Sequence, residues 1–182
     1  MEISSTATRL LVKYPTFKEF GERFNVSAAS SYGKRDLVGI CINGNHCTMR
    51  EIALIYGESA PKAWLVVQLT GLAISLGLDA KTRKEQLLDL ATILADDYGW
   101  LKYTEFLQIF NYLRRYDFYG RFDPAVILKG IRDWNKYVRV PTIEAHERQL
   151  REAEEERWKQ NAVPMPAATR EKLNKLLGKF GQ

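Results

Sequence analysis

Apolar residues recur at intervals of three and four along most of the chain after residue 48, the spacing that gathers them on one face of a helix. This pattern predicts helices over 49–56, 61–77, 82–98, 102–114 and 124–138. The second of these is apolar on nearly every side, which is typical of a helix buried in a core. The sequence therefore predicts a mainly α fold, organised as a compact multi-helix domain.

Capping signals mark several ends of these helices. Thr48 is followed three residues later by Glu51, which is the spacing of a capping box. The pair Asp123-Pro124 places a capping carboxylate before a proline at the first helical position. Glycine directly after an aromatic residue, as in Tyr56-Gly57, supplies the left-handed residue that often closes a helix.

The first 47 residues have the least regular pattern. Residues 16–24 are predicted to be helical. The weak alternation of residues 37–42 precedes Asn43-Gly44, a frequent turn sequence between antiparallel strands. A short β-hairpin is therefore expected within 37–47.

The character of the chain changes after residue 138. Opposite charges stand four residues apart through 144–160, where Leu150 and Trp158 are the large apolar side chains. Each such pair adds only about 0.2–0.5 kcal/mol to a helix. We expect a globular domain over 1–138 and an extended, solvated charged helix over 139–160.

The last segment, 161–182, begins with a proline-containing linker and ends in an amphipathic stretch. Its apolar stripe, at positions i, i+3, i+4 and i+7, consists of Leu173, Leu176, Leu177 and Phe180. Lysines and an arginine flank the stripe and give residues 167–182 a net charge of +3. This pattern predicts a tail that binds a groove on a partner protein, with folding back onto its own domain as the alternative. Membrane-surface binding is less favoured because the stripe buries little area.

Composition is that of a globular protein with a mild basic excess. The 182 residues are 46% hydrophobic, which is enough to build a core and argues against global disorder. Lysine and arginine number 27 against 22 acidic residues, so nucleic acid is an acceptable partner without being required. The N-terminus lacks the apolar run of a signal peptide, and the longest uncharged run, 63–78, is too short and polar to span a membrane. A cytoplasmic location without membrane contact is expected.

The chemistry-bearing residues are few. The sequence has no phosphate-binding loop, dinucleotide fingerprint, nucleophile elbow or zinc-protease motif. Cys41, His46 and Cys47 are three soft ligands, but a structural zinc site needs four at other spacings. Buried thiols are the favoured interpretation, and no catalytic residue, metal or cofactor is predicted.

Two segments are candidates for nucleic-acid binding. On a helix beginning at Pro124, one face carries Ile127, Ile131, Trp134 and Val138, and another carries Lys129, Arg132, Lys136 and Arg139. A basic stripe opposite an apolar stripe suits a nucleic-acid backbone or an acidic partner surface, and aromatic residues can stack on single-stranded bases. Aromatic core residues and solvated cations would give the same pattern.

The second candidate is residues 16–35, which resemble a helix-turn-helix that ends in Lys34 and Arg35. Residues 49–65 show a similar spacing, but the helix that follows is too apolar to be exposed and is expected to be core.

Three motifs resemble those of a family of small uncharacterised helical proteins of bacterial prophages and mobile elements. They are Ala63-Trp64-Leu65, Tyr103-Thr104-Glu105-Phe106 and the run from Tyr119 to Pro124, within a match over 48–138. More loosely, the architecture and the tail sequence PMPAATREKLNKLL resemble phage helicase loaders and related DNA replication proteins. This resemblance implies an all-helical domain and a C-terminal segment that engages a replicative helicase. Because the chain has no phosphate-binding loop, any loading would not depend on ATP.

The leading hypothesis is a non-enzymatic adaptor of a phage or mobile element that binds a partner protein through its tail and nucleic acid through the basic helix. The alternative is a helix-turn-helix transcriptional regulator. An enzyme with an unfamiliar site is a third hypothesis, and the oligomeric state is left open.

Overall fold

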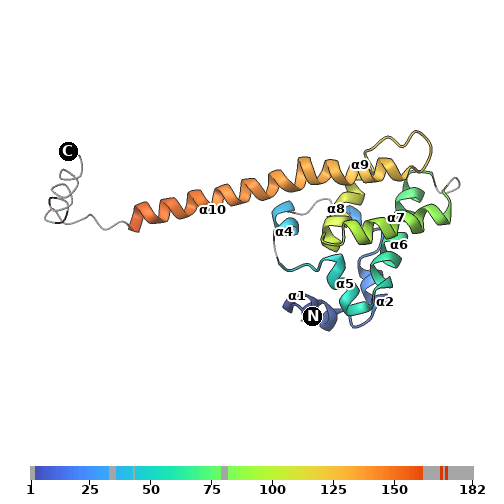
Figure 1. Cartoon of the computed structure of the whole chain (residues 1–182), viewed down its shortest axis with the longest axis horizontal. Helices are drawn as coiled ribbons and strands as arrows, with labels where there is room; N and C mark the ends of the chain where they lie inside the picture. Colours follow the sequence, from blue (N-terminus) through green and yellow to red (C-terminus); the bar gives the residue numbers. More distant parts are fainter. Residues whose placement is uncertain are drawn as a thin grey trace, which may run out of the picture. The chain divides into compact units, whose positions relative to one another are not determined.

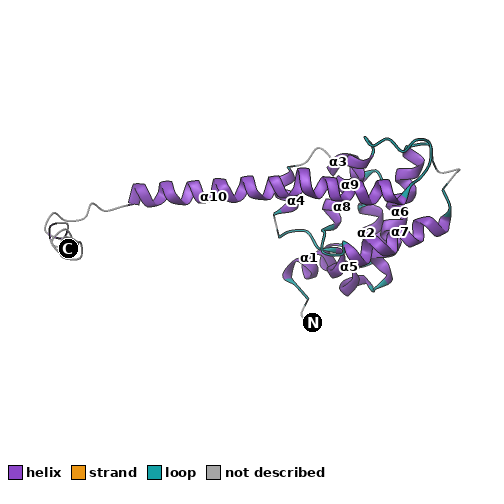
Figure 2. Cartoon of the chain, turned by 45° about the horizontal axis from the view of Figure 1, so that its top comes forward, coloured by secondary structure: helices purple, strands orange, loops and turns teal. Residues whose placement is uncertain are grey.

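The computed structural model describes residues 3–32, 36–42, 44–78 and 82–161, together with Thr169 and Glu171. Contacts divide the chain into two units, Met1–Glu144 and Ala145–Gln182. The described residues form helices joined by loops, and their β pairing is limited to one bridge between Thr48 and Lys102 (Figures 1 and 2). The mainly α fold is therefore confirmed.

In the described residues before 48, the chain forms four short helices. They are α1 (Ser5–Lys13), α2 (Phe17–Arg23), α3 (Ala28–Tyr32) and α4 (Leu37–Cys41). The expected hairpin is wrong, because residues 37–41 are helical. The Asp36 carboxylate accepts hydrogen bonds from the backbone N–H groups of Val38 at 3.0 Å and Gly39 at 3.1 Å, so a local cap outweighs the weak alternation.

The helices predicted after residue 48 are present with small shifts at their ends. They are α5 (Met49–Tyr56), α6 (Ser59–Ser75), α7 (Lys84–Asp97), α8 (Tyr103–Leu113) and α9 (Pro124–Trp134). Thr48 and Glu51 form the predicted capping box at the start of α5, and Gly57 closes that helix with φ of 99°. The predicted cap at Asp123 is also present.

The most enclosed helix is α8 rather than α6. Every residue from Tyr103 to Phe110 is buried, including the polar Thr104, Glu105 and Gln108. By contrast, α6 packs along α7 (Figure 1) and leaves Val67 53% and Ile74 59% exposed. The expectation that α6 is buried on all sides is therefore only half met.

The helix that begins at Pro124 does not end near Val138. A π-helical turn, η2 (Asn135–Arg139), follows α9 directly and leads into α10 (Val140–Asn161). Because helical residues precede it without a break, Pro141 occupies an interior position of this helix, and its missing N–H group removes one backbone hydrogen bond next to the π-helical turn. The extended charged helix is thus confirmed, and none of its residues is buried. No helix in the described part of the chain has the length and apolar character needed to cross a membrane.

Candidate nucleic-acid interface and basic pocket

Three of the four predicted basic residues form an outward face of α9 and η2, which we call the α9 cationic face: Lys129, Arg132 and Lys136. All three are exposed, while Ile127, Ile131 and Trp134 on the opposite side are buried as predicted. Lys129 Nζ lies 3.1 Å from Asp133 Oδ2, which also accepts a hydrogen bond from the Tyr116 hydroxyl at 2.8 Å. These two hydrogen bonds lower the pKa of Asp133.

Arg139, the fourth predicted residue, points to a different environment. Its Nε donates to Glu105 Oε1 at 2.7 Å, and its guanidinium carbon lies 4.9 Å from the centroid of the Trp100 ring. A π-helical turn advances less around the axis per residue than an α-helix does, so it rotates Arg139 away from the stripe predicted for a regular helix. Arg139 is therefore half-buried in an ion pair and does not belong to the cationic face.

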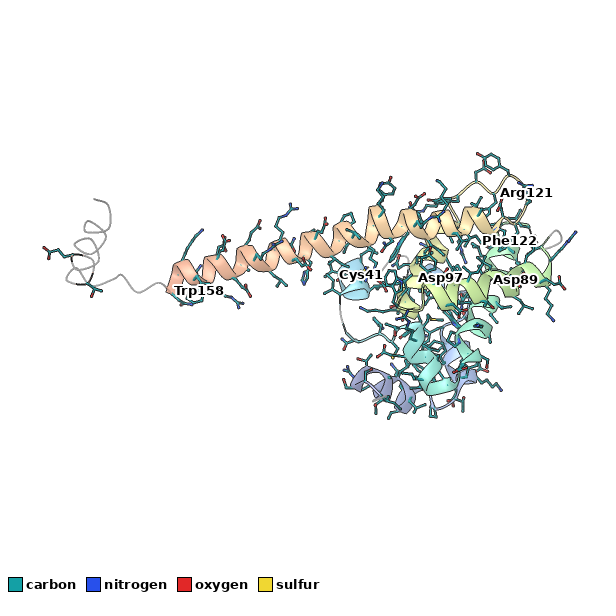
Figure 3. All side chains as sticks on the ribbon, viewed as in Figure 1. Cys41, Asp89, Asp97, Arg121, Phe122 and Trp158 are labelled. Atoms are coloured by element: carbon teal, nitrogen blue, oxygen red, sulfur yellow. The ribbon has the colours of Figure 1, made fainter. Side chains whose placement is uncertain are left out.

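The aromatic residues of this region divide into two groups. Phe118, Phe122 and Trp134 are buried, whereas Tyr119 is 84% exposed and Tyr137 62% exposed. The turn before α9, which contains Arg121 and Phe122 (Figure 3), holds Tyr119 at a positive φ of 49°. Lys136 Nζ lies 4.9 Å from the centroid of the Tyr137 ring. Within 112–139 the aromatic side chains that are well exposed for base stacking are thus these two tyrosines, while Tyr112 and Tyr116 are half-buried.

A charged cluster beneath η2 joins α4 to α8. Lys102 Nζ donates to the carbonyls of Ile40 at 3.3 Å and Cys41 at 2.8 Å, and burial lowers the pKa of this lysine. Burial and the neighbouring Glu105 carboxylate raise the pKa of Cys41, shown on α4 in Figure 3, to about 11. This arrangement ties three elements together and gives no accessible nucleophile.

The predicted buried thiols are confirmed. Cys41 and Cys47 are free and buried, and burial raises the pKa of Cys47 to about 12, so both thiols are protonated at neutral pH. His46 lies against Tyr103, with its Nδ1 3.3 Å from the phenol oxygen. Among the described residues, no three histidine, cysteine, aspartate or glutamate side chains are grouped closely enough to hold a metal ion.

In the helix-turn-helix candidate, α2 and α3 are fixed from behind by buried polar side chains. The Phe24 carbonyl accepts hydrogen bonds from Trp64 Nε1 at 2.8 Å and Gln68 Nε2 at 2.7 Å, and the Tyr32 carbonyl accepts one from Gln108 Nε2. The short α3 also packs against α8.

The basic end of this candidate motif, Lys34 and Arg35, lies outside the described residues. DNA reading by this segment stays a prediction. The inner face of α6 is core, as expected for the second helix of the weaker candidate over 49–65.

A concave site that the sequence did not reveal lies beside these helices. This N-terminal basic pocket has a volume of about 480 Å³ and is bordered by the cations of Arg9, Lys13 and Arg23. The half-buried Tyr14 and the buried Phe24 and Tyr32 are among the residues of its wall, and no described aspartate or glutamate lines it. The spacing of Arg9 and Lys13 becomes informative only once α1 is known to be helical.

The predicted partner-binding residues Leu173, Leu176, Leu177 and Phe180 lie outside the described residues. Comparison of the chain with family models, with curated proteins and with solved structures finds no match. The resemblance to mobile-element and helicase-loader proteins therefore remains an expectation from the sequence.

Proposed function

We propose that this protein is a non-enzymatic adaptor that binds nucleic acid through the α9 cationic face and a partner protein through its C-terminal tail. The observation that supports nucleic-acid binding is the outward placement of Lys129, Arg132 and Lys136 opposite a buried apolar face of the same helix. The resemblance noted in the sequence favours replication on a phage or mobile element, with a replicative helicase as the partner.

The chemistry of this face favours single-stranded nucleic acid. Cations on one helical face can follow a phosphate backbone, and each neutralised phosphate releases a bound counterion. Tyr137 is exposed directly beside Lys136, and aromatic rings stack on bases that are not already paired. Binding of a duplex would use the cations alone, so the Tyr137 ring would not contribute to the affinity.

Replacing Lys129, Arg132 and Lys136 together with glutamine is expected to weaken binding of a short fluorescent single-stranded DNA about tenfold at low salt. The dependence of log affinity on log salt should become shallower by about 2, since each lost phosphate contact removes roughly 0.7 from the slope. Fluorescence anisotropy over a salt series measures both quantities.

The matched control replaces Arg148, Arg151 and Lys159 of α10 with glutamine, which removes the same net charge from another helix. Its effect should stay within about threefold, because phosphate contacts and not net charge position the strand. Equal losses in the two triple variants, or unchanged binding in the first, would overturn the proposed interface.

For the tail, Leu176→Asp is expected to reduce recovery of the protein partner at least about tenfold in a nuclease-treated pull-down from the native host, because a charge in the apolar stripe cannot enter a groove. The melting temperature should not change. Asn174→Asp adds the same charge outside the stripe and serves as the control. If Leu176→Asp lowers the melting temperature as much as partner recovery, the tail belongs to the fold and not to an interface.

A further inference from the structure

We propose that the N-terminal basic pocket binds a phosphomonoester attached to a planar ring, the chemistry of a nucleoside monophosphate or of a 5′-phosphorylated strand end. This site goes beyond the proposed function, because its residues come from α1, α2, α3 and α8, from Tyr14 and Phe24 directly after α1 and α2, and from residues 45–46, and not from α9. Three features support it: uncompensated positive charge, a fixed aromatic wall and a volume suited to a small ligand.

The cations of the pocket lack acidic partners in the described part of the chain. Arg9 and Lys13 stand four residues apart on α1, and Arg23 ends α2; none of them has a described carboxylate oxygen within 4.0 Å. The Arg9 hydrogen bonds to the Ser5 carbonyl and the Thr6 hydroxyl are long, at 3.4 Å each, so its guanidinium keeps donors for a ligand. A like-charge pair at this spacing is unfavourable in a helix, and a bound anion would relieve the repulsion.

The wall of the pocket is aromatic and held in place before any ligand arrives. Phe24, Tyr32 and Tyr103 are buried, and the ring centroids of Phe24 and Tyr103 are 4.5 Å apart. The carbonyls of Phe24 and Tyr32 are hydrogen-bonded from behind by the buried side chains of α6 and α8 described above. Tyr14, which also lines the pocket and is only half-buried, packs edge-on against Phe24 with the ring centroids 5.5 Å apart. A planar ring of the ligand can contact the accessible part of Tyr14, while the buried rings behind it hold this wall in place and so limit the loss of conformational freedom on binding.

The size of the pocket favours a phosphate with an attached ring over phosphate alone. Its volume of about 480 Å³ lies within the range of clefts that enclose small organic ligands. Its lining combines the cations of α1 and α2 with aromatic residues, so one ligand of this size can meet both. A terminal phosphate carries more charge than a backbone phosphodiester, so it gains more from several converging cations.

The test is isothermal titration of the full chain with adenosine monophosphate, adenosine and inorganic phosphate. We expect the monophosphate to bind at least tenfold more tightly than either fragment. Replacing Arg9 and Lys13 together with glutamine should weaken this binding at least tenfold. The matched variant of Arg83 and Lys84, an exposed arginine and lysine outside the pocket, should stay within twofold.

Two further arms make the outcome decisive. The monophosphate should raise the melting temperature of the wild-type chain and not that of the Arg9 and Lys13 variant, which itself should remain folded.

Competition by a 5′-phosphorylated oligonucleotide, and not by its 5′-hydroxyl form, would identify a strand end as the source of the phosphate. Absence of competition would identify a free nucleotide. No binding of the monophosphate, equal binding of adenosine, or full binding by the Arg9 and Lys13 variant would overturn the proposal. Since the α9 cationic face is intact in this variant, failure here is distinguishable from failure of the proposed function.

Discussion

Replacing Glu105 with glutamine is expected to lower the free energy of unfolding by about 3–5 kcal/mol, because it leaves the Arg139 charge in the interior without its partner. The Glu105 side chain is 1% exposed and that of Arg139 22%. One carboxylate oxygen accepts from Arg139 Nε at 2.7 Å, and the other accepts from the backbone N–H of Lys102 at 2.8 Å. An uncharged amide of the same shape can keep the second contact but cannot balance the guanidinium.

Urea denaturation of the full chain measures this loss, with Glu22→Gln as the matched control. Glu22 forms an ion pair with Lys18 at 3.9 Å in which both side chains are well exposed, so the control should lose less than about 0.5 kcal/mol. A loss below about 1 kcal/mol for Glu105→Gln would mean that Arg139 reaches solvent when its partner is removed.

Much of the fold follows from periodicity and caps along the chain. The helices α5 to α9 were predictable because their apolar spacing agrees with local signals such as Thr48 and Asp123. The hairpin expected within 37–47 failed because the Asp36 cap forms a helix that weak alternation did not indicate. The helix continues past Val138 through a π-helical turn that ends two residues before Pro141, a residue that would interrupt a regular α-helix.

The candidate sites show where sequence reasoning stops. The cationic face was predictable to the extent that α9 is a regular helix, and Arg139 departs from it where the helix becomes irregular. The basic pocket was not predictable, since its cations and rings come from separate elements brought together only by packing. The wall of the pocket is fixed by Gln68 and Gln108, which donate hydrogen bonds to the carbonyls of Phe24 and Tyr32. The apolar pattern of a helix does not indicate which distant carbonyl a buried glutamine will bind.

Gly71 sets how closely α6 approaches the connection between α2 and α3. A Cβ atom at this position would overlap both methyl groups of Val26 and would lie 2.8 Å from its Cβ. The backbone fixes the position of the Val26 Cβ, and the branched side chain brings both of its methyl groups into the same space, so Gly71→Ala requires the two segments to separate. We expect a net loss of about 2 kcal/mol in the free energy of unfolding, since overpacking outweighs the roughly 1 kcal/mol gain in helix propensity.

The sign of this effect should reverse when the obstructing side chain is removed. In a Val26→Gly background, Gly71→Ala is expected to stabilise the protein by up to about 1 kcal/mol, since only the helix-propensity gain remains. Gly21→Ala in α2, where an added Cβ meets nothing within 4 Å, is the control and should stabilise the wild-type chain by about 0.5–1 kcal/mol. The four chains of this double-mutant cycle are compared by urea denaturation. A stabilising effect of Gly71→Ala in the wild type would show that Val26 can move aside without loss of stability.

Because the α2–α3 connection begins at Phe24, a separation caused by Gly71→Ala should also weaken ligand binding in the basic pocket, whereas Gly21→Ala should not.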